Sequence, residues 1–169
     1  MRLRQGCRGW WIALLAALAD RLTKALAARL PGAGGTLIPG LVKLTPVENR
    51  GVAFSMFSGQ NLPIVLGTAA LIAGIIVWLI ARPDAPKPLR AGLWLIVGGG
   101  LGNLYDRLTL GGVSDFIELA FMRFAVFNVA DVCICVGAAL AIIGTALAPD
   151  GPRAGDRRRG ADDAGRGNL

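Results

Sequence analysis

The chain contains no histidine, and this absence removes whole classes of chemistry. A catalytic triad built on histidine, a Cys-His pair and any histidine-ligated metal site are excluded. Cysteine is scarce as well, with three in 169 residues, so a disulfide scaffold is also excluded. Any reaction must therefore use carboxylates, amides, hydroxyls, thiols or the cations of lysine and arginine.

Charged residues are also few, at 17%, whereas apolar residues reach 54% and the mean hydropathy is +0.56. Soluble chains hold about 25% charged residues, and so apolar a chain is not disordered over its whole length. The net charge is +7, but the basic residues gather at the N-terminus, in the segment 82–90 and in the tail. That distribution is typical of a membrane protein under the positive-inside rule. We therefore expect membrane lipid around the chain, and no nucleic-acid partner.

Four apolar segments approach the length of about 20 residues that a membrane-spanning helix needs. They lie at about 10–30, 62–81, 89–107 and 126–148. A cleaved signal peptide is the alternative for the first segment, but its apolar character resumes over 25–30, which favours a retained helix. The sequence thus predicts one four-span membrane domain over 1–148 and a disordered cytoplasmic tail over 149–169.

The basic segments predict the orientation of these spans. With four spans, the N-terminus, the segment 82–90 and the tail share one side, which is then cytoplasmic. Tryptophans near the cytoplasmic span ends are expected to be interface anchors: Trp10, Trp11, Trp78 and Trp94. The connection 31–61 carries glycine and proline punctuation and short β-like pieces. The predicted fold class is therefore an all-α integral membrane protein, with four transmembrane helices and a small β-rich exported connection between spans 1 and 2.

Polar residues inside an apolar span are costly, so each one is a candidate for a function. Asp20 and Lys24 are four residues apart and share a helix face, which favours an internal ion pair that helps the first helix to pack. Gly98 and Gly102 have the spacing that allows another helix to approach closely.

A polar face follows near the end of the third span, formed by Asn103, Asp106 and Arg107. Two interpretations are equally open. The face could pack helices through an Asp–Arg pair, or the planar fork of Arg107 could hold a carbonyl or phosphate of a substrate.

Two further carboxylates border the exported side. Asp115 follows a Gly-Gly pair, and Asp131 lies with Asn128 at the start of the fourth span. The third span leaves and the fourth enters on this side, so the two carboxylates can meet. Facing carboxylates share a proton: one acts as general base on water, and the other donates to the developing oxyanion. Asp106 is a rival member of this pair.

Five motifs, in order, resemble those of bacterial lipoprotein signal peptidase, also called signal peptidase II. They are DRLTK (20–24), ENRGVAFS (48–55), GGGLGNLYDR (98–107), GVSDF (112–116) and FNVADVCI (127–134). The resemblance implies a four-span enzyme of the bacterial cytoplasmic membrane with its active site toward the exported face. Such an enzyme removes the signal peptide of diacylglyceryl-modified prolipoproteins just before the lipidated cysteine, by an aspartyl mechanism without metal or cofactor.

The resemblance also implies a role for each matching position. The catalytic pair would be Asp115 and Asp131. Substrate-binding positions would be Asn49, Gly51, Asn103, Arg107 and Asn128, and structural polar positions Asp20, Lys24 and Asp106. The implied partners are diacylated prolipoproteins and membrane lipid, and a monomer suffices because one chain supplies both aspartates.

Three other functions stay open on the residues alone. A small transporter uses intramembrane charges, although transporter folds usually carry internal repeats, and we find none here. A serine–lysine peptidase would pair Ser55, Ser58 or Ser114 with Lys24 or Lys43, although no spacing marks any of these pairs. A membrane scaffold would use the polar residues for helix packing alone.

Overall fold

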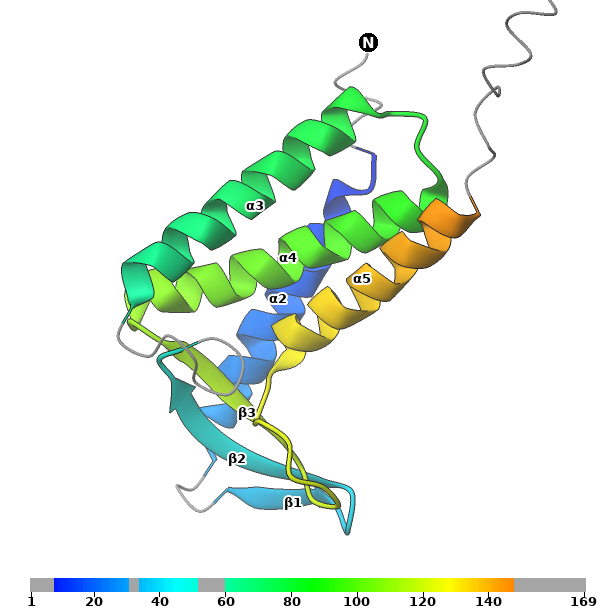
Figure 1. Ribbon diagram of the computed structural model, residues 1–169. Helices are drawn as coiled ribbons and strands as arrows, with labels where there is room; N and C mark the ends of the chain where they lie inside the picture. Colours follow the sequence, from blue (N-terminus) through cyan, green and yellow to red (C-terminus); the bar gives the residue numbers. More distant parts are fainter. Residues whose placement is uncertain (1–7, 31–33, 52–59, 148–169) are drawn as a thin grey trace, which may run out of the picture.

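A computed structural model describes residues 8–30, 34–51 and 60–147 (Figure 1). The basic N-terminal segment 1–7 and the tail 149–169, for which we made predictions above, lie outside these residues. The elements in chain order are α2 (Trp10–Ala27), β1 (Gly35–Ile38), β2 (Val42–Asn49), α3 (Asn61–Ala81), α4 (Lys87–Thr109), β3 (Val113–Leu119) and α5 (Val129–Ala146).

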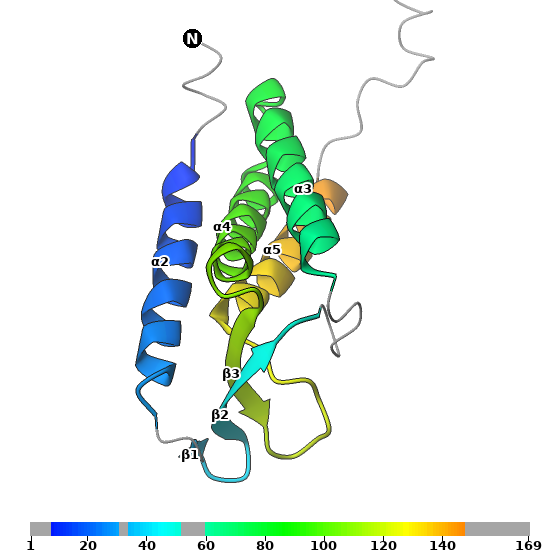
Figure 2. The ribbon, with the colours of Figure 1, turned by 90° about the vertical axis from the view of Figure 1, so that its left-hand side faces the viewer.

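The four helices lie side by side, and the three strands gather at one end of the bundle (Figures 1 and 2). The start of α2, the connection between α3 and α4 and the end of α5 lie at the opposite end. Each predicted span corresponds to one of these helices, although α2 ends at Ala27, short of the predicted position 30. Helix α4 lies at the centre and contacts the other three.

Prolines punctuate the connection between α3 and α4. Helix α3 ends at Ala81, because Pro83 disfavours a helical conformation for the residue before it. Helix α4 then begins at Lys87 with Pro88 in its first turn, where the missing N–H costs no helical hydrogen bond. Together the two prolines place a sharp reversal at the end of the bundle opposite the sheet.

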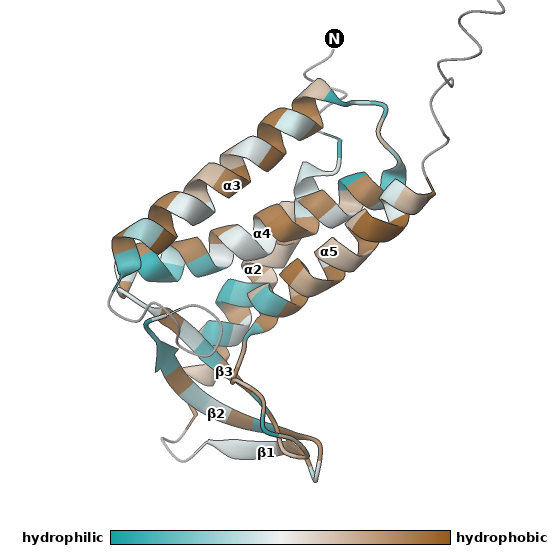
Figure 3. Cartoon of the chain, in the orientation of Figure 1, coloured by the Kyte–Doolittle hydropathy of each residue, from teal (hydrophilic) through white to brown (hydrophobic). Residues whose placement is uncertain are grey.

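Apolar side chains are exposed along the helices. Brown, hydrophobic residues recur along the ribbons of α3 and α5 (Figure 3). On α3, Leu62, Leu66, Leu71 and Val77 are each at least 60% exposed. Helices α3 and α5 are long and apolar enough to cross a membrane. Exposed apolar surface on this scale marks contact with another molecule or a membrane.

Glycines let α4 approach its neighbours on two faces. An added Cβ at Gly98 would lie 2.5 Å from the carbonyl oxygen of Ala13 on α2, which confirms the predicted close helix approach. An added Cβ at Gly99 would lie 2.4 Å from the carbonyl oxygen of Ala130 on α5. Both neighbours are backbone atoms, so no side-chain rotation relieves the clash.

We expect Gly99→Ala to lower the free energy of unfolding by about 1–3 kcal/mol, the usual cost of overpacking. The matched control is Gly67→Ala on α3, where an added Cβ meets nothing within 4 Å. There the better helix propensity of alanine is the main effect. Thermal unfolding in detergent measures both, and equal stability of the two variants would contradict the packing described here.

The sheet is antiparallel in the order β1-β2-β3. Strands β1 and β2 come from the connection predicted to be β-rich, but β3 comes from the second connection, where we predicted no strand. In the register of β2 and β3, Val47 lies opposite Asp115 and Asn49 opposite Val113. Pairing of two distant segments thus places Asn49 next to the strand that carries Asp115.

Trp94 corrects the prediction that all four tryptophans are interface anchors. Trp10 and Trp11 are more than half exposed, but Trp94 is 6% exposed and donates its indole N–H to the carbonyl oxygen of Arg8 at 2.9 Å. The buried Arg90 donates to the same oxygen at 3.0 Å. Trp94 therefore belongs to the core, because α4 is surrounded by other helices.

Candidate active site

Asp115 and Asp131 line one cavity of about 600 Å³ between the helices and the sheet. Asp115 lies on β3 and is 3% exposed. Asp131 lies in the first turn of α5. The remaining lining is mostly apolar and comes from α3, α4, α5, the segment 124–127 and residues of β2 and β3. The structure thus brings both carboxylates to the same cavity, as the connectivity predicted.

Asn128 and Asp131 cap helix α5 reciprocally. The Asn128 side-chain oxygen accepts from the Asp131 N–H at 3.0 Å, and an Asp131 carboxylate oxygen accepts from the Asn128 N–H at 3.1 Å. This capping box satisfies two helix N–H groups and fixes the Asp131 carboxyl relative to the helix axis. The Asn128 and Asp131 side chains therefore also stabilise the N-terminus of α5.

Three asparagine amides each donate an N–H to one of the two aspartates. Asn49 donates to Asp115 at 3.0 Å, Asn128 donates to Asp115 at 2.6 Å, and Asn103 donates to Asp131 at 2.8 Å. The two oxygens of Asp115 therefore each accept from a different amide.

The orientation of each amide is set by a group at its other end that can only donate. The Gly51 N–H donates to the Asn49 oxygen, the Asp131 N–H to the Asn128 oxygen, and the Lys24 ammonium to the Asn103 oxygen. An amide whose oxygen is held by an obligate donor must present its N–H groups on the other side. The three N–H groups are therefore aimed at the carboxylates before any substrate arrives.

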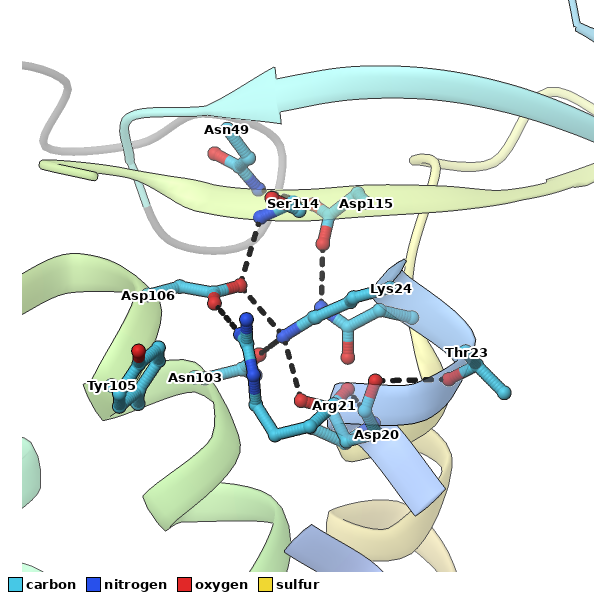
Figure 4. A network of polar contacts seen from close by, with 12 residues as sticks. Asp20, Arg21, Thr23, Lys24, Asn49, Asn103, Tyr105, Asp106, Ser114 and Asp115 are labelled. Carbon is cyan, nitrogen blue, oxygen red and sulfur yellow. Dashed lines mark hydrogen bonds and ion pairs between the residues drawn. The ribbon is translucent and has the colours of Figure 1, made fainter. Parts of the chain in front are cut away.

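A second polar cluster, which includes residues of α2, lies next to the asparagines that hold the two aspartates (Figure 4). Lys24 pairs with Asp20 at 2.9 Å, which confirms the predicted ion pair, and with Asp106 at 2.8 Å. Asp106 also pairs with Arg21 and accepts from the Ser114 N–H at 3.2 Å. The side chains of Lys24, Asp20 and Asp106 are at most 2% exposed. The cluster joins α2, α4 and β3, and the hydrogen bond from Lys24 connects it to Asn103 in the cavity lining.

Asp106 and Arg107 do not form the ion pair that the sequence left open. Asp106 points to α2, whereas the Arg107 guanidinium donates from Nη2 to the Gly51 carbonyl oxygen at 2.6 Å. Adjacent residues on a helix point about 100° apart, so they do not face each other. The buried Nη1 of Arg107 has no hydrogen-bond partner among the described residues, and Arg107 lines the cavity.

Burial raises the pKa of Asp115 from its ordinary value of 3.8 to about 6. The hydrogen bond from Asn49 opposes this rise, and the neighbouring charge of Asp131 adds to it. Desolvation disfavours the charged carboxylate, and a like charge nearby has the same effect. Asp115 therefore holds its proton to a higher pH than an exposed aspartate.

Comparison with known proteins shows the family of this chain. The sequence profile of the family described as signal peptidase (SPase) II matches residues 12–147. The lipoprotein signal peptidase of Thermosynechococcus vestitus is 38% identical over 133 residues, covering 76% of this chain and 84% of that protein. That of Gloeobacter violaceus is 38% identical over 138 residues, covering 80% of each chain.

The chain belongs to the signal peptidase II family. It is a peptidase, and the family removes signal peptides from prolipoproteins. Two solved structures, each described as a bacterial membrane enzyme crystallised in meso, have the same fold. One is 28% identical with a TM-score of 0.74, covering 80% of this chain and 85% of its own, and the other is 29% identical with a TM-score of 0.72, covering 83% and 92%.

The contacts of Lys24 in this signal peptidase II do not suit a lysine base. A lysine base must be neutral to accept a proton. Lys24 is instead held between two carboxylates, and its third hydrogen bond goes to Asn103. Ser55 and Ser58 lie outside the described residues.

Sequence reasoning missed several polar residues of this signal peptidase II. Arg21 pairs with Asp106 and lies over the Tyr105 ring, 4.4 Å from its centroid. Asn61 donates to the carbonyl oxygen of Arg107 at 3.0 Å. The sequence could have predicted a role for Arg21 in this cluster, because Arg21 precedes Lys24 by three residues and so shares its helix face. Asn61 offered none, since its partner lies 46 residues away.

Proposed function

We propose that this signal peptidase II is a membrane-embedded aspartyl endopeptidase that uses Asp115 and Asp131 to activate water. One observation carries the proposal: two carboxylates border one largely apolar cavity, and oriented amides hold both. The substrate would be a prolipoprotein that already carries diacylglycerol, cleaved just before the lipidated cysteine.

The charge balance around the cavity favours a single shared proton. Four carboxylates lie in the two clusters, on Asp20, Asp106, Asp115 and Asp131, and three cations face them, on Arg21, Lys24 and Arg107. With all seven groups charged, the sum is one negative charge. One proton on the Asp115–Asp131 pair makes the sum neutral, which is the cheapest state in an apolar surrounding.

The chemistry follows from that single proton. The ionised carboxylate takes a proton from water as the water oxygen attacks the scissile carbonyl carbon. The protonated carboxyl gives its proton to the carbonyl oxygen, which stabilises the tetrahedral intermediate. Collapse breaks the C–N bond: the proton taken from water passes to the leaving amine, and one hydroxyl proton of the tetrahedral intermediate returns to the carboxyl that had donated its own, so the pair again holds one proton. Both carboxyls border the same space, so neither needs to move far between these steps.

The position of the pair also suits a lipidated substrate. Asp131 begins α5 and Asp115 lies on β3, so the pair lies where the helices meet the sheet. We propose that the four helices span the bacterial cytoplasmic membrane and that this end faces the exported side. The basic residues Arg82, Lys87 and Arg90 lie at or beside the opposite end of the bundle, which supports a cytoplasmic location for both termini.

The test is cleavage of a diacylated prolipoprotein by the purified protein in detergent. We expect one cut immediately before the modified cysteine, and much slower cleavage of the matched precursor without diacylglycerol. Mass spectrometry of both products locates the cut. The absence of cleavage with either precursor would contradict the proposed function and restore the transporter and scaffold interpretations.

Arg107 supplies a second, separable prediction about substrate binding. We expect Arg107→Lys to lower kcat/KM by about tenfold to a hundredfold, because a hydrogen bond to a charged group is worth about 1.5–3 kcal/mol. In the wild type, Nη2 of Arg107 donates to the Gly51 carbonyl oxygen, and Nη1 has no hydrogen-bond partner among the described residues. Lysine keeps the positive charge but has no planar guanidinium that could make both contacts. Steady-state kinetics measures the change, and an unaltered kcat/KM would show that the fork has no role in substrate binding.

The pH dependence of cleavage tests the environment of Asp115. Cleavage falls on the alkaline side once the pair loses its shared proton, so a higher pKa moves that limb to higher pH. The hydrogen bond from Asn49 lowers the pKa of Asp115, so Asn49→Ala removes this effect. We expect the alkaline limb of kcat/KM to shift upward by about one pH unit.

Thr45→Ala is the matched control for that pH profile. Thr45 lies on the same strand, β2, and its hydroxyl bonds to Glu118 instead of to the aspartates. Its profile should overlie that of the wild type. A downward shift in Asn49→Ala, or the same shift in both variants, would show that the Asn49 hydrogen bond does not set the titration of the pair.

A further inference from the structure

A second cavity opens beside Asp115, on the side of the sheet. It holds about 950 Å³ and is lined by the end of β2, the second half of β3 and the segment 119–126. Asn49, Asp115, Leu119 and the segment 124–126 border both cavities, whereas Asp131, Asn103 and Arg107 border only the cavity between the helices. We call the second cavity the sheet groove and the first the helix cavity. Asp115 therefore lies at the junction of two spaces.

The two spaces differ in their chemistry. Beyond its polar residues, which include Asn103, Arg107 and Asp131, the helix cavity is lined mostly by apolar side chains, such as Ile64, Val132 and Val136. The sheet groove carries ionisable side chains, namely Glu48, Glu118 and Arg123, beside its apolar ones. A chain that passes Asp115 from one space to the other thus moves from an apolar to a polar surrounding.

Resting on the proposed function, we propose that the sheet groove binds the mature segment of the substrate, the extended hydrophilic peptide that follows the lipidated cysteine. The helix cavity then takes the apolar signal peptide and the lipid. A prolipoprotein changes from apolar to polar at the scissile bond, and the site changes in the same way at Asp115. Asp115 is accordingly the carboxyl on the side of the leaving amine.

The charges of the groove indicate what kind of peptide it accepts. Glu48 pairs with Arg50 at 2.9 Å, and Glu118 accepts from Thr45 and lies opposite Lys43 in the sheet. Arg123 adds a positive charge on the other wall. Acidic and basic groups are therefore interspersed, so neither sign of peptide charge is strongly favoured. The groove therefore suits an extended hydrophilic chain. It would recognise the length and polarity of that chain, whatever its exact sequence.

Site-specific photocrosslinking tests this placement directly. A benzophenone amino acid replaces Met122 in the sheet groove or Val136 in the helix cavity, two positions that are each 47% exposed. Each replacement is made in Asp131→Asn protein, so that the substrate stays whole. The probe is a diacylated prolipoprotein with different labels on its signal peptide and its mature segment. We expect Met122→benzoylphenylalanine to capture the mature segment and Val136→benzoylphenylalanine the signal peptide. Capture of the signal peptide from Met122, or no capture there while position 136 crosslinks, would overturn the inference.

A kinetic arm uses substrates that end two or eight residues after the cysteine. We expect the wild type to cleave the longer one with a kcat/KM about tenfold higher, since the groove adds binding energy. Ala120→Trp fills the groove and should bring the ratio of the two values close to one. Leu41→Trp, at an exposed position of the turn between β1 and β2 and outside the groove lining, should keep the wild-type ratio. Equal cleavage of both lengths by the wild type would refute the groove while leaving the proposed function intact; failure to cleave either would refute the function itself.

Discussion

Replacing Asp115 or Asp131 with asparagine is expected to reduce cleavage of a diacylated prolipoprotein at least about a thousandfold, since each variant removes a general acid or base. Asparagine keeps the shape of the side chain but removes its titration. Neither variant can form a pair that shares one proton between two carboxyls, so water is not deprotonated or the oxyanion receives no proton. Single-turnover cleavage in detergent measures the loss, and retained thermal unfolding shows that the fold is intact.

Asp106→Asn is the control for that experiment. Asp106 is fully buried, but its oxygens are taken by Lys24, Arg21 and the Ser114 N–H, so it holds elements together. We expect this variant to lose stability and to keep measurable turnover. Turnover in Asp115→Asn, together with a folded but inactive Asp106→Asn, would show that Asp106 is the true partner of Asp131.

Lys24→Met is expected to lower the free energy of unfolding by about 3–5 kcal/mol, the usual cost of removing one partner of a buried ion pair. The Lys24 side chain is 2% exposed, and its removal leaves Asp20 without its cation and Asp106 with Arg21 alone. The Asn103 amide also loses the donor that fixes its orientation toward Asp131. Thermal unfolding in detergent measures the first effect and kcat the second.

Lys43→Met provides the comparison for Lys24→Met. Lys43 lies on β2 and is exposed, so its replacement removes the same charge from a site where water screens it. We expect almost no change in unfolding for this variant. If both lysines contributed equally, the buried cluster would not be what holds α2 to α4.

Local features of the sequence were enough to predict the helices and much of the polar machinery. Apolar runs between proline and glycine punctuation marked the four helices, because hydropathy and helix breaking depend on neighbours in the chain. The Asp20–Lys24 ion pair and the close approach at Gly98 followed from helical spacing in the same way. The resemblance of five motifs to signal peptidase II also needed no structure, and the family match confirms it.

Other features depended on which distant segments pack together. Strand β3 had no predicted strand character of its own, and it exists because its backbone pairs with β2. That pairing brings Asn49 to Asp115 across 66 residues, and helix packing brings Arg21 to Asp106 across 85. Partner choice over such separations is decided by which backbone groups and charges must be satisfied once water is excluded. The sequence alone thus determined which polar residues stand at the helix ends; only the tertiary structure decided which of them face each other, because that depends on the burial that folding creates.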